Sequence, residues 1–477
     1  VRSIRHEYAP GQWAGCRFDG DAFELEDQRN NSDASFKTYN RSNMMPRPYM
    51  LRAGVPLRQS VELSLESPPT RSRTRRDATV VVRFGEEIGR LLPIGVEISP
   101  RDVAADQATR RALAALRPAH LHLALEPDGK AIDWKRVAEL LESAGARLRL
   151  DVTVGDVAHA HPVLESLRGA LSAAHLVPES VAIFPSEPSC VDAARERFPD
   201  SLIGGGTPHF FVQLNRLEGI GNVDFLTFTT SPIVHGADDE SVMLSLQSLP
   251  SMVATLNARY PGVPIRVGPS TIAARMSPLG RQPETDGTRR TALARQDPRC
   301  RGLYGAAWLL GYVAQLAAAR VDAVTLMSLC GDCGVVGPAR SGIVSRYPTY
   351  HLLERLHAPA RAVDVTISDP TRAAALAITR GDRHELLLAN LTSEAIEFDL
   401  GDRLESLAVS VMDSRSWQTA ATKNDVWRAE RQRPHAAVLT LDAYAVARLE
   451  RRKPSSAKTP NAIKLSVDGS GTASGSL

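Results

Sequence analysis

The feature that most constrains the fold is a regular alternation of apolar strand-like runs with Ala- and Leu-rich helical runs across residues 78–357. Between the predicted strands, DWKRVAELLESAGA (133–146) is helix-like, and LYGAAWLLGYVAQLAAA (303–319) is apolar on nearly every face, as expected for a helix buried in a barrel wall. Eight strand–helix units over about 280 residues predict an α/β fold, a (β/α)8 TIM barrel. A doubly wound sheet is the alternative, disfavoured because no GxGxxG follows the first strand. The predicted strands lie at 91–99, 120–126, 147–154, 180–185, 201–206, 224–230, 265–271 and 322–329.

The segments on both sides of the barrel show the two-residue periodicity of half-buried strands. VELSLE (61–66) is the clearest case before the barrel, and five more strands are predicted between 362 and 450. We therefore expect N- and C-terminal β-strands to form an accessory β-sandwich together. The predicted division is an N-terminal β region at 1–77, the barrel at 78–357, a C-terminal β-sandwich at 358–452 and a disordered tail at 453–477.

Composition argues against several kinds of partner. The 57 basic and 54 acidic residues give a net charge of +3, which provides no general reason to expect binding to nucleic acid or to an acidic membrane. No apolar run reaches the roughly 20 residues that a membrane helix needs. The first residues, VRSIRHEYAPG, lack the apolar stretch of a secretory signal. Five scattered cysteines make a disulfide scaffold a poor fit, so we expect a cytoplasmic protein. The oligomeric state stays open.

Barrel enzymes carry catalytic groups at the carboxyl ends of their strands, and the loop after the sixth predicted strand is the richest in such groups. In SPIVHGADDES (231–241), His235 is followed three residues later by Asp238. A carboxylate at this spacing can orient an imidazole that acts as a general base. The same residues also suit a helix start, with Asp238 or Asp239 as N-cap and acidic residues in the first turn. Both interpretations stay open.

Further polar residues follow the neighbouring strands. Asn215 and Arg216 follow the fifth strand and suit sugar hydroxyls or a developing oxyanion, and His209 precedes them. Glu187 stands where many barrel glycosidases carry an acid–base carboxylate, although SEPS also reads as a capped helix start. Glu97, at the end of the first strand, completes the predicted substrate-binding set.

We expect neither a cofactor nor a metal. CGDC (330–333) has no second CxxC or HxxxH pair to complete a zinc site. Redox CxxC motifs normally open a helix in a small thioredoxin-like unit, which this is not, so these cysteines are interpreted as structural or incidental. The chain also has no GxSxG motif, which disfavours the serine mechanism of α/β-hydrolases.

The segment FELEDQRNNSDASFKTYNR (23–41) places charged groups between aromatic anchors, which predicts a polar network near a ligand or a domain seam. FELEDQRNNSDASFKTY resembles the N-terminal signature of the D-apionate lactonase family. The resemblance runs through most of the chain. It continues in GGGTPHFFVQLNR (204–216), DFLTFTTSPIVHGADDES (224–241), DPRCRGLYGAAWLLGYVAQLAAARVDAVT (297–325) and YPTYHLLERL (347–356).

This resemblance implies a bacterial hydrolase that opens a five-membered sugar-acid lactone, D-apionolactone, to D-apionate. It also implies a glycosidase-like barrel and a small sugar lactone as the partner. On this basis we expect His235, oriented by Asp238, to activate water. Arg216 and Asn215 would stabilise the oxyanion and position the ring, and Glu187 would protonate the leaving oxygen.

The chain departs from the family pattern at three positions. Gln213 and Ser328 stand where the resemblance implies carboxylates, and Asn31 stands where it implies Trp. Gln cannot act as a base and Ser is a poor one, so a non-catalytic carbohydrate-binding descendant is one alternative. The other is a retaining glycosidase, with two carboxylates about 5 Å apart. It is disfavoured because GPSTIAARMSP (268–278), after the seventh strand, offers no carboxylate as nucleophile.

Overall fold

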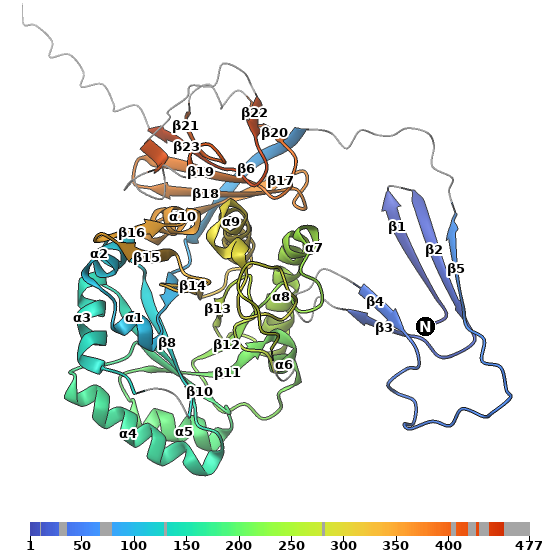
Figure 1. The fold of residues 1–477 in the computed structure, drawn as a ribbon, viewed down its shortest axis with the longest axis horizontal. Helices are drawn as coiled ribbons and strands as arrows, with labels where there is room; N and C mark the ends of the chain where they lie inside the picture. Colours follow the sequence, from blue (N-terminus) through green and yellow to red (C-terminus); the bar gives the residue numbers. More distant parts are fainter. Residues whose placement is uncertain are drawn as a thin grey trace, which may run out of the picture.

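In a computed structural model of the chain, all eight predicted strands close into one parallel barrel (Figure 1). They follow one another around the barrel in chain order, with the last strand hydrogen-bonded to the first. The predicted (β/α)8 barrel is therefore confirmed. Its strands are β7 (Ile94–Glu97), β8 (His120–Leu125), β9 (Arg147–Thr153), β10 (Ser180–Phe184), β11 (Leu202–Phe210), β12 (Phe225–Thr229), β13 (Ile265–Ser270) and β14 (Ala323–Ser328). The structure describes residues 1–9, 11–27, 36–66, 79–127, 131–278, 282–401, 407–417, 426–428 and 438–452.

Helices cover the outside of the barrel (Figure 1). Helix α3 shows why they form where they do: Asp133 accepts a hydrogen bond from the N–H of Arg136 as its N-cap, and Gly145 ends it with a left-handed backbone at φ 62°. The α-helices are α1 (Pro100–Val103), α2 (Gln107–Leu116), α3 (Trp134–Ala144), α4 (Ala160–Ala173), α5 (Pro188–Arg197), α6 (Phe211–Arg216), α7 (Asp239–Leu244), α8 (Leu249–Arg259), α9 (Leu303–Ala318) and α10 (Pro348–His357). Short 3-10 turns are η2 (Val157–His159), η3 (Ser245–Ser248), η4 (Pro298–Arg301) and η6 (Val426–Arg428), and a hairpin of β15 (Val336–Arg340) and β16 (Ile343–Arg346) precedes α10.

The barrel strands alternate between two environments. On β8 and β9, Leu121, Leu123, Leu148 and Leu150 belong to the large apolar core that they share with the helices. The residues between them point inward, where polar side chains and a small cluster of Ala182, Phe184 and Phe225 fill the barrel. TIM barrels usually fill this space with branched apolar residues. A polar interior therefore leaves charged groups within reach of the barrel mouth.

Helix α9 lies between the barrel and a second β layer (Figure 1). Twelve of its residues are buried, including Trp308 and Tyr312, because it packs on the barrel on one side and on the C-terminal sheet on the other. This explains why the 303–319 segment is apolar on nearly every face, as the sequence predicts.

The C-terminal strands form an eight-stranded sheet, in the order β21-β23-β19-β18-β17-β6-β20-β22. Its apolar core combines strands from both ends of that order, so the sheet folds over itself. A buried carboxylate, Glu385, fixes one face through Arg355, Arg380 and Arg448, with N–O distances of 3.4, 2.7 and 2.7 Å. The strands are β6 (Thr79–Arg90), β17 (Arg361–Ile367), β18 (Ala373–Arg380), β19 (Arg383–Asn390), β20 (Ile396–Asp399), β21 (Ala408–Met412), β22 (Val438–Leu441) and β23 (Val446–Arg452).

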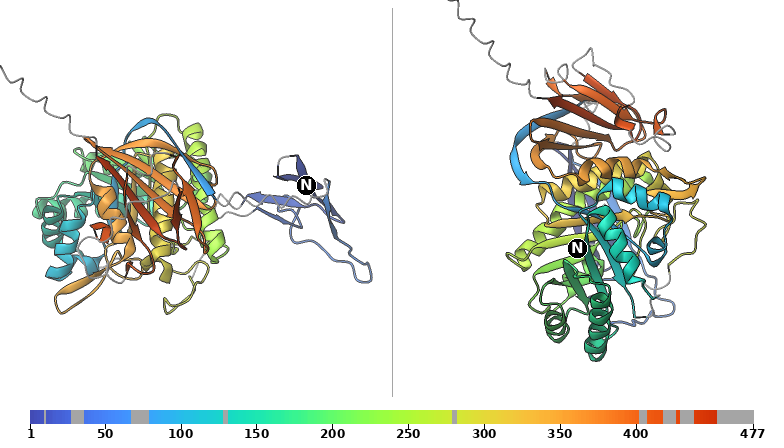
Figure 2. Two further views of the ribbon diagram at one scale, coloured as in Figure 1. Left: turned by 90° about the horizontal axis from the view of Figure 1, so that it is seen from above. Right: turned by 90° about the vertical axis from the view of Figure 1, so that its left-hand side faces the viewer.

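An accessory β domain with strands from both sides of the barrel is confirmed, but the N-terminal contribution differs from the expected one. It is β6, residues 79–90, that joins the sheet, pairing with β17 and β20. The strands before residue 67 pair with one another instead. β1 (Ser3–Ala9), β2 (Gln12–Asp19) and β5 (Ser60–Leu65) form one sheet, and β3 (Glu24–Asp27) and β4 (Phe36–Tyr39) form a hairpin. Both lie to one side of the barrel (Figures 1 and 2).

Several expectations lie wholly or partly outside the described residues. These are the tail at 453–477 and the middle of the polar segment 23–41, including Asn31. In the described part of that segment, Glu24 accepts hydrogen bonds from Ser42 and from the N–H of Asn43. The predicted domain boundaries, and a role for the segment at a seam or over a substrate, stay predictions. No helix within the described ranges combines the length and the apolar character needed to cross a bilayer.

Candidate active site

The carboxyl ends of β7 and β14 and the loop after β13 meet in a buried ion pair. Glu97, which ends β7, pairs with both prongs of the Arg275 guanidinium; its Oε2 lies 2.9 Å from Arg275 Nε. Ser328, at the end of β14, donates a hydrogen bond of 2.9 Å to the same oxygen. Burial lowers the pKa of Arg275 to about 10, which leaves the guanidinium charged at neutral pH. The predicted site residue Glu97 thus sits in a fixed, charged cluster at the mouth.

Deeper in the barrel, β8 and β9 contribute a second cluster. His122 is 4% exposed, and its Nε2 lies 3.2 Å from Asp151 Oδ2. Both residues line a cavity of about 20 Å³, together with Thr227, Gly268 and Thr325. A polar cavity of this size can hold about one water molecule. Arg149 and Arg266 line the same cavity, where Arg149 is paired with Glu179 and Arg266 with Asp322.

The segment from β11 into α6 presents two buried polar atoms without a hydrogen-bond partner among the described residues. They are Nδ1 of His209 and Oε1 of Gln213, four residues apart. Burial lowers the pKa of His209, so this side chain is neutral at pH 7. Unsatisfied buried groups of this kind are uncommon in folded proteins, and a ligand hydroxyl could pair with them.

The loop carrying His235 lies at the rim between β12 and α7, and His235 is exposed. Asp238 is the N-cap of α7, accepting a 2.8 Å hydrogen bond from the N–H of Ser241. Burial opposes ionisation of Asp238, but the hydrogen bonds from Ser241 outweigh it and lower the pKa of the carboxyl. The helix-start interpretation of Asp238 is therefore realised. Its orienting role toward His235 stays a prediction.

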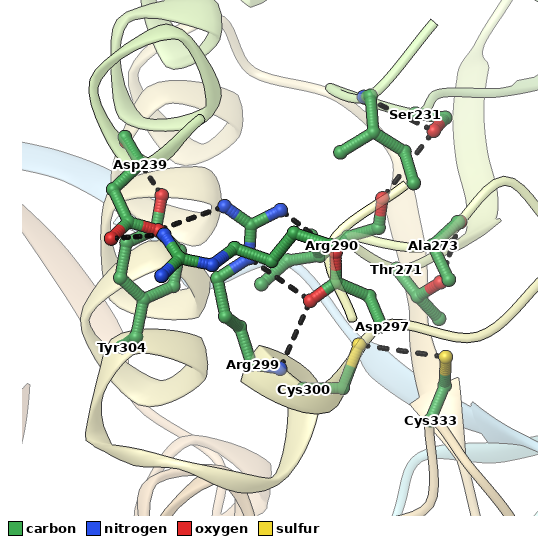
Figure 3. A network of polar contacts seen from close by, with 12 residues as sticks. Ser231, Asp239, Thr271, Ala273, Arg290, Asp297, Arg299, Cys300, Tyr304 and Cys333 are labelled. Atoms are coloured by element: carbon green, nitrogen blue, oxygen red, sulfur yellow. Dashed lines mark hydrogen bonds and ion pairs between the residues drawn. The ribbon is translucent and has the colours of Figure 1, made fainter. Parts of the chain in front are cut away.

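Asp239 ties this rim loop to the long loop after β13 (Figure 3). Its carboxylate pairs with Arg299 at 2.9 Å and with Arg290 at 2.7 Å, and its carbonyl accepts from Tyr304. Arg299 in turn contacts the fully buried carboxylate of Asp297 at 2.7 Å. Two loops of the mouth are thus held against each other by a charge network that the sequence analysis did not foresee.

The remaining predicted residues occupy more open positions. Glu187 is exposed at the start of α5, where it is the N-cap residue, and Arg216 is exposed at the end of α6. Asn215 is half-buried, and its carbonyl accepts a hydrogen bond from Arg259. Their roles in catalysis or binding stay predictions.

The cysteines of CGDC lie apart. Cys333 is buried with its Sγ 3.4 Å from that of Cys300 in η4, whereas Cys330 is half-buried (Figure 3). Among the described residues, no three His, Cys, Asp or Glu side chains are placed to hold a metal ion.

His122 is the functional candidate that sequence reasoning missed. The signal was present in HLHLAL (120–125) and RLRLDVT (147–153), where polar residues alternate with leucines. In an ordinary half-buried strand this alternation means that the polar face meets solvent. In this closed barrel the polar face of β8 and β9 is the interior, so the same pattern here marks a charged core.

A parallel barrel with charged groups at the carboxyl ends of its strands and a β-sandwich attached defines a TIM-barrel protein built like glycoside hydrolases. Solved structures with this architecture include an α-L-arabinofuranosidase from Thermotoga maritima, at TM-score 0.52 and 11% identity over 79% of this chain and all of that one. Another is the family 51 α-L-arabinofuranosidase AbfB from Bifidobacterium longum, at TM-score 0.51 and 11% identity over 78% of this chain and 99% of that one. At such identities the likeness shows the fold alone.

Sequence comparison gives the particular family. Models of three D-apionate lactonase domains match the chain: the N-terminal domain over residues 1–68, the TIM barrel domain over 94–361 and the C-terminal immunoglobulin-like domain over 370–449. The chain therefore belongs to the D-apionate lactonase family. A D-apionate lactonase from Brucella anthropi is 33% identical over 431 residues, which cover 83% of this chain and 68% of that protein.

Proposed function

We propose that this protein hydrolyses a sugar-acid lactone, opening D-apionolactone to D-apionate in carbohydrate metabolism. The observation that carries this proposal is the 33% identity to a D-apionate lactonase over most of the chain. Lactone opening needs an activated water, a stabiliser for the oxyanion and a proton for the leaving alkoxide. The charged, buried mouth of the barrel offers groups of all three kinds. A cytoplasmic location stays a prediction from the cysteine pattern.

Arg275 is well suited to stabilise the oxyanion. Glu97 holds one side of its guanidinium, and the carbonyl of Pro269 lies 3.4 Å from its Nη1, so the charge is fixed at the strand ends before substrate arrives. A preoriented cation in a partly desolvated site stabilises developing negative charge without reorganisation. The unpaired atoms of His209 and Gln213 are candidates for contacts with sugar hydroxyls.

The more exposed residues at the rim of the barrel are the second set of candidates for the catalytic roles. His235 as base, oriented by Asp238, remains part of the proposal, as do Arg216 and Asn215 at the oxyanion. Glu187 remains the proposed donor to the leaving oxygen. The cap that Asp238 makes on α7 competes with its use as an orienter, so a His235→Ala variant is the direct test of this assignment.

The retaining glycosidase is less well supported. Its nucleophile belongs at the end of β13, where this chain has Gly268, cis-Pro269, Ser270 and Thr271 and so offers no carboxylate. The carbohydrate-binding alternative rests on Gln213 and Ser328. Ser328 is occupied in holding Glu97, which keeps a carboxylate at this end of the barrel although the strand itself carries a serine.

The test is a pH-indicator hydrolysis assay of the purified protein on a panel of aldonolactones that includes D-apionolactone. We expect turnover, and a loss of roughly 10²-fold or more in kcat for Arg275→Lys, which keeps the charge but loses the two-pronged geometry. Loss of activity in His235→Ala would support the rim base; near-full activity would exclude it. No turnover on any lactone, with binding still visible by calorimetry, would refute the hydrolase and identify a binding protein.

A further inference from the structure

The inner face of β8 and β9 brings together an imidazole and two carboxylates from different strands. His122 is the register partner of Glu97, so both side chains leave the barrel wall on its inner side. Asp151 is the register partner of Ala124, the next inward residue after His122. Asp151 therefore lies one step nearer the carboxyl end than His122, with the imidazole 3.2 Å behind its carboxylate.

Glu126 extends the same inward row. It follows Ala124 by two residues, just beyond the last residue of β8, and its side chain is open to solvent at the mouth. Partial burial raises the pKa of Glu126, and the negative charge of Asp151 raises it further. The two carboxyl groups thus influence each other electrostatically but have different surroundings. Pairs of this kind commonly divide into one ionised and one protonated partner.

As the alternative to His235 and Glu187, we propose that Asp151 is the general base of the lactone hydrolysis and Glu126 its general acid, with His122 as a positioning residue behind Asp151. This inference rests on the proposed function. It draws on the buried row of the barrel rather than on the rim residues that the sequence singles out. The cavity of about 20 Å³ beside His122 and Asp151 is also lined by Ser180, Phe225 and Ala323, the first residues of their strands, so the attacking water would approach Asp151 from the opposite side, at the mouth.

The reaction balances in two steps. Asp151 takes a proton from water as the water oxygen bonds to the lactone carbonyl carbon, and the carbonyl electron pair moves to its oxygen, where Arg275 faces it. The tetrahedral intermediate then re-forms the carbonyl and breaks the bond from carbon to the ring oxygen, which takes the proton of Glu126. The product is a hydroxy acid, which ionises at neutral pH. Glu126 recovers a proton, and Asp151 releases one to solvent.

Other charged groups that face this row act in defined ways. Glu97 is neutralised by Arg275 on the β7 side. Arg149 and Arg266 line the same cavity as His122 and Asp151, and each is paired with a carboxylate outside the row, Glu179 and Asp322 respectively. Each of these charges is therefore already paired with an opposite charge.

The test compares kcat and KM from pH 5 to 9 for wild type, Asp151→Asn, Glu126→Gln and His122→Gln, on the lactone that the wild type turns over fastest. Glu142→Gln, an exposed acid on the outer helix α3, is the matched control and should behave as wild type. We expect Asp151→Asn and Glu126→Gln each to lower kcat about 10²–10⁴-fold with a much smaller change in KM. Glu126→Gln should also lose the fall in rate at high pH, and His122→Gln should shift the low-pH limb.

If these residues had only a structural role, their variants would unfold at a lower temperature but the folded enzyme would keep the wild-type pH profile of kcat. Glu126 is open to solvent, so its variant keeps the test decisive even if Asp151→Asn is unstable. An active wild type whose Glu126→Gln variant keeps its kcat within threefold and an unchanged pH profile overturns this inference and leaves the proposed function standing. A wild type inactive on every lactone overturns both.

Discussion

Replacing Arg299 should destabilise the barrel far more than replacing Arg290, although both arginines pair with the same carboxylate of Asp239. Arg299 is 8% exposed and also contacts Asp297, which is fully buried and accepts from its Nε, its Nη2 and its backbone N–H. Arg290 is 51% exposed and pairs with Asp239 at 2.7 Å. Arg299→Gln and Arg290→Gln therefore each remove one ion pair with Asp239, but only Arg299→Gln also leaves the buried Asp297 without its partner.

The magnitudes follow from burial. Arg299→Gln leaves the buried charge of Asp297 without its partner, a change that costs about 3–5 kcal/mol in proteins. Arg290→Gln removes an exposed ion pair, which contributes about 0–1 kcal/mol. Burial opposes the charge of Arg299, but its hydrogen bonds to Asp297 outweigh this and raise its pKa, so the pair stays intact across ordinary pH.

Urea unfolding followed by tryptophan fluorescence at pH 7 measures the difference, with circular dichroism to confirm that both variants are folded before denaturant is added. We expect the free energy of unfolding to fall by at least about 2 kcal/mol more in Arg299→Gln than in Arg290→Gln. Equal effects of the two substitutions would show that Asp297 is not dependent on Arg299, and the reasoning from burial would be wrong.

Two further predictions concern packing and pH. Gly204→Ala would place a Cβ 2.2 Å from the Phe225 ring inside the barrel and should lower the free energy of unfolding by about 1–3 kcal/mol, measured by thermal unfolding. Gly169→Ala, on the exposed face of α4 with nothing within 4 Å of the new Cβ, should instead raise it by about 0.5–1 kcal/mol. A Gly204→Ala protein as stable as wild type would contradict the packing argument. Burial opposes the charge of Glu385, but its three arginines lower its pKa, so it contributes stability above its unfolded-state pKa that is lost as pH falls through the folded-state pKa. Glu385→Gln should therefore flatten the acid dependence of the unfolding free energy below about pH 4.5 while destabilising the protein at pH 7, and an acid dependence identical to wild type would argue against this account.

The sequence by itself determined the elements of the barrel. All eight strands lie where apolar runs predicted them, because a strand in a closed barrel must bury its outer face against helices and so carries a local apolar signal. The helix start at Asp238 was also within reach, since capping is a local interaction between a side chain and a backbone N–H three residues later.

The tertiary structure decided which distant residues meet. Glu97 contacts Arg275 and Ser328, which are 178 and 231 residues away, and no local pattern relates them. β6 precedes the barrel strands in the sequence and β17 follows them, yet the two strands pair. They can pair because the chain enters and leaves the barrel at neighbouring points, where the N–H of Leu91 donates to the carbonyl of Ala360. Barrel closure turned the polar face of β8 and β9 inward and brought His122 to Asp151. The sequence supplied that alternation, but only the closed sheet made its polar side an interior where charges need partners.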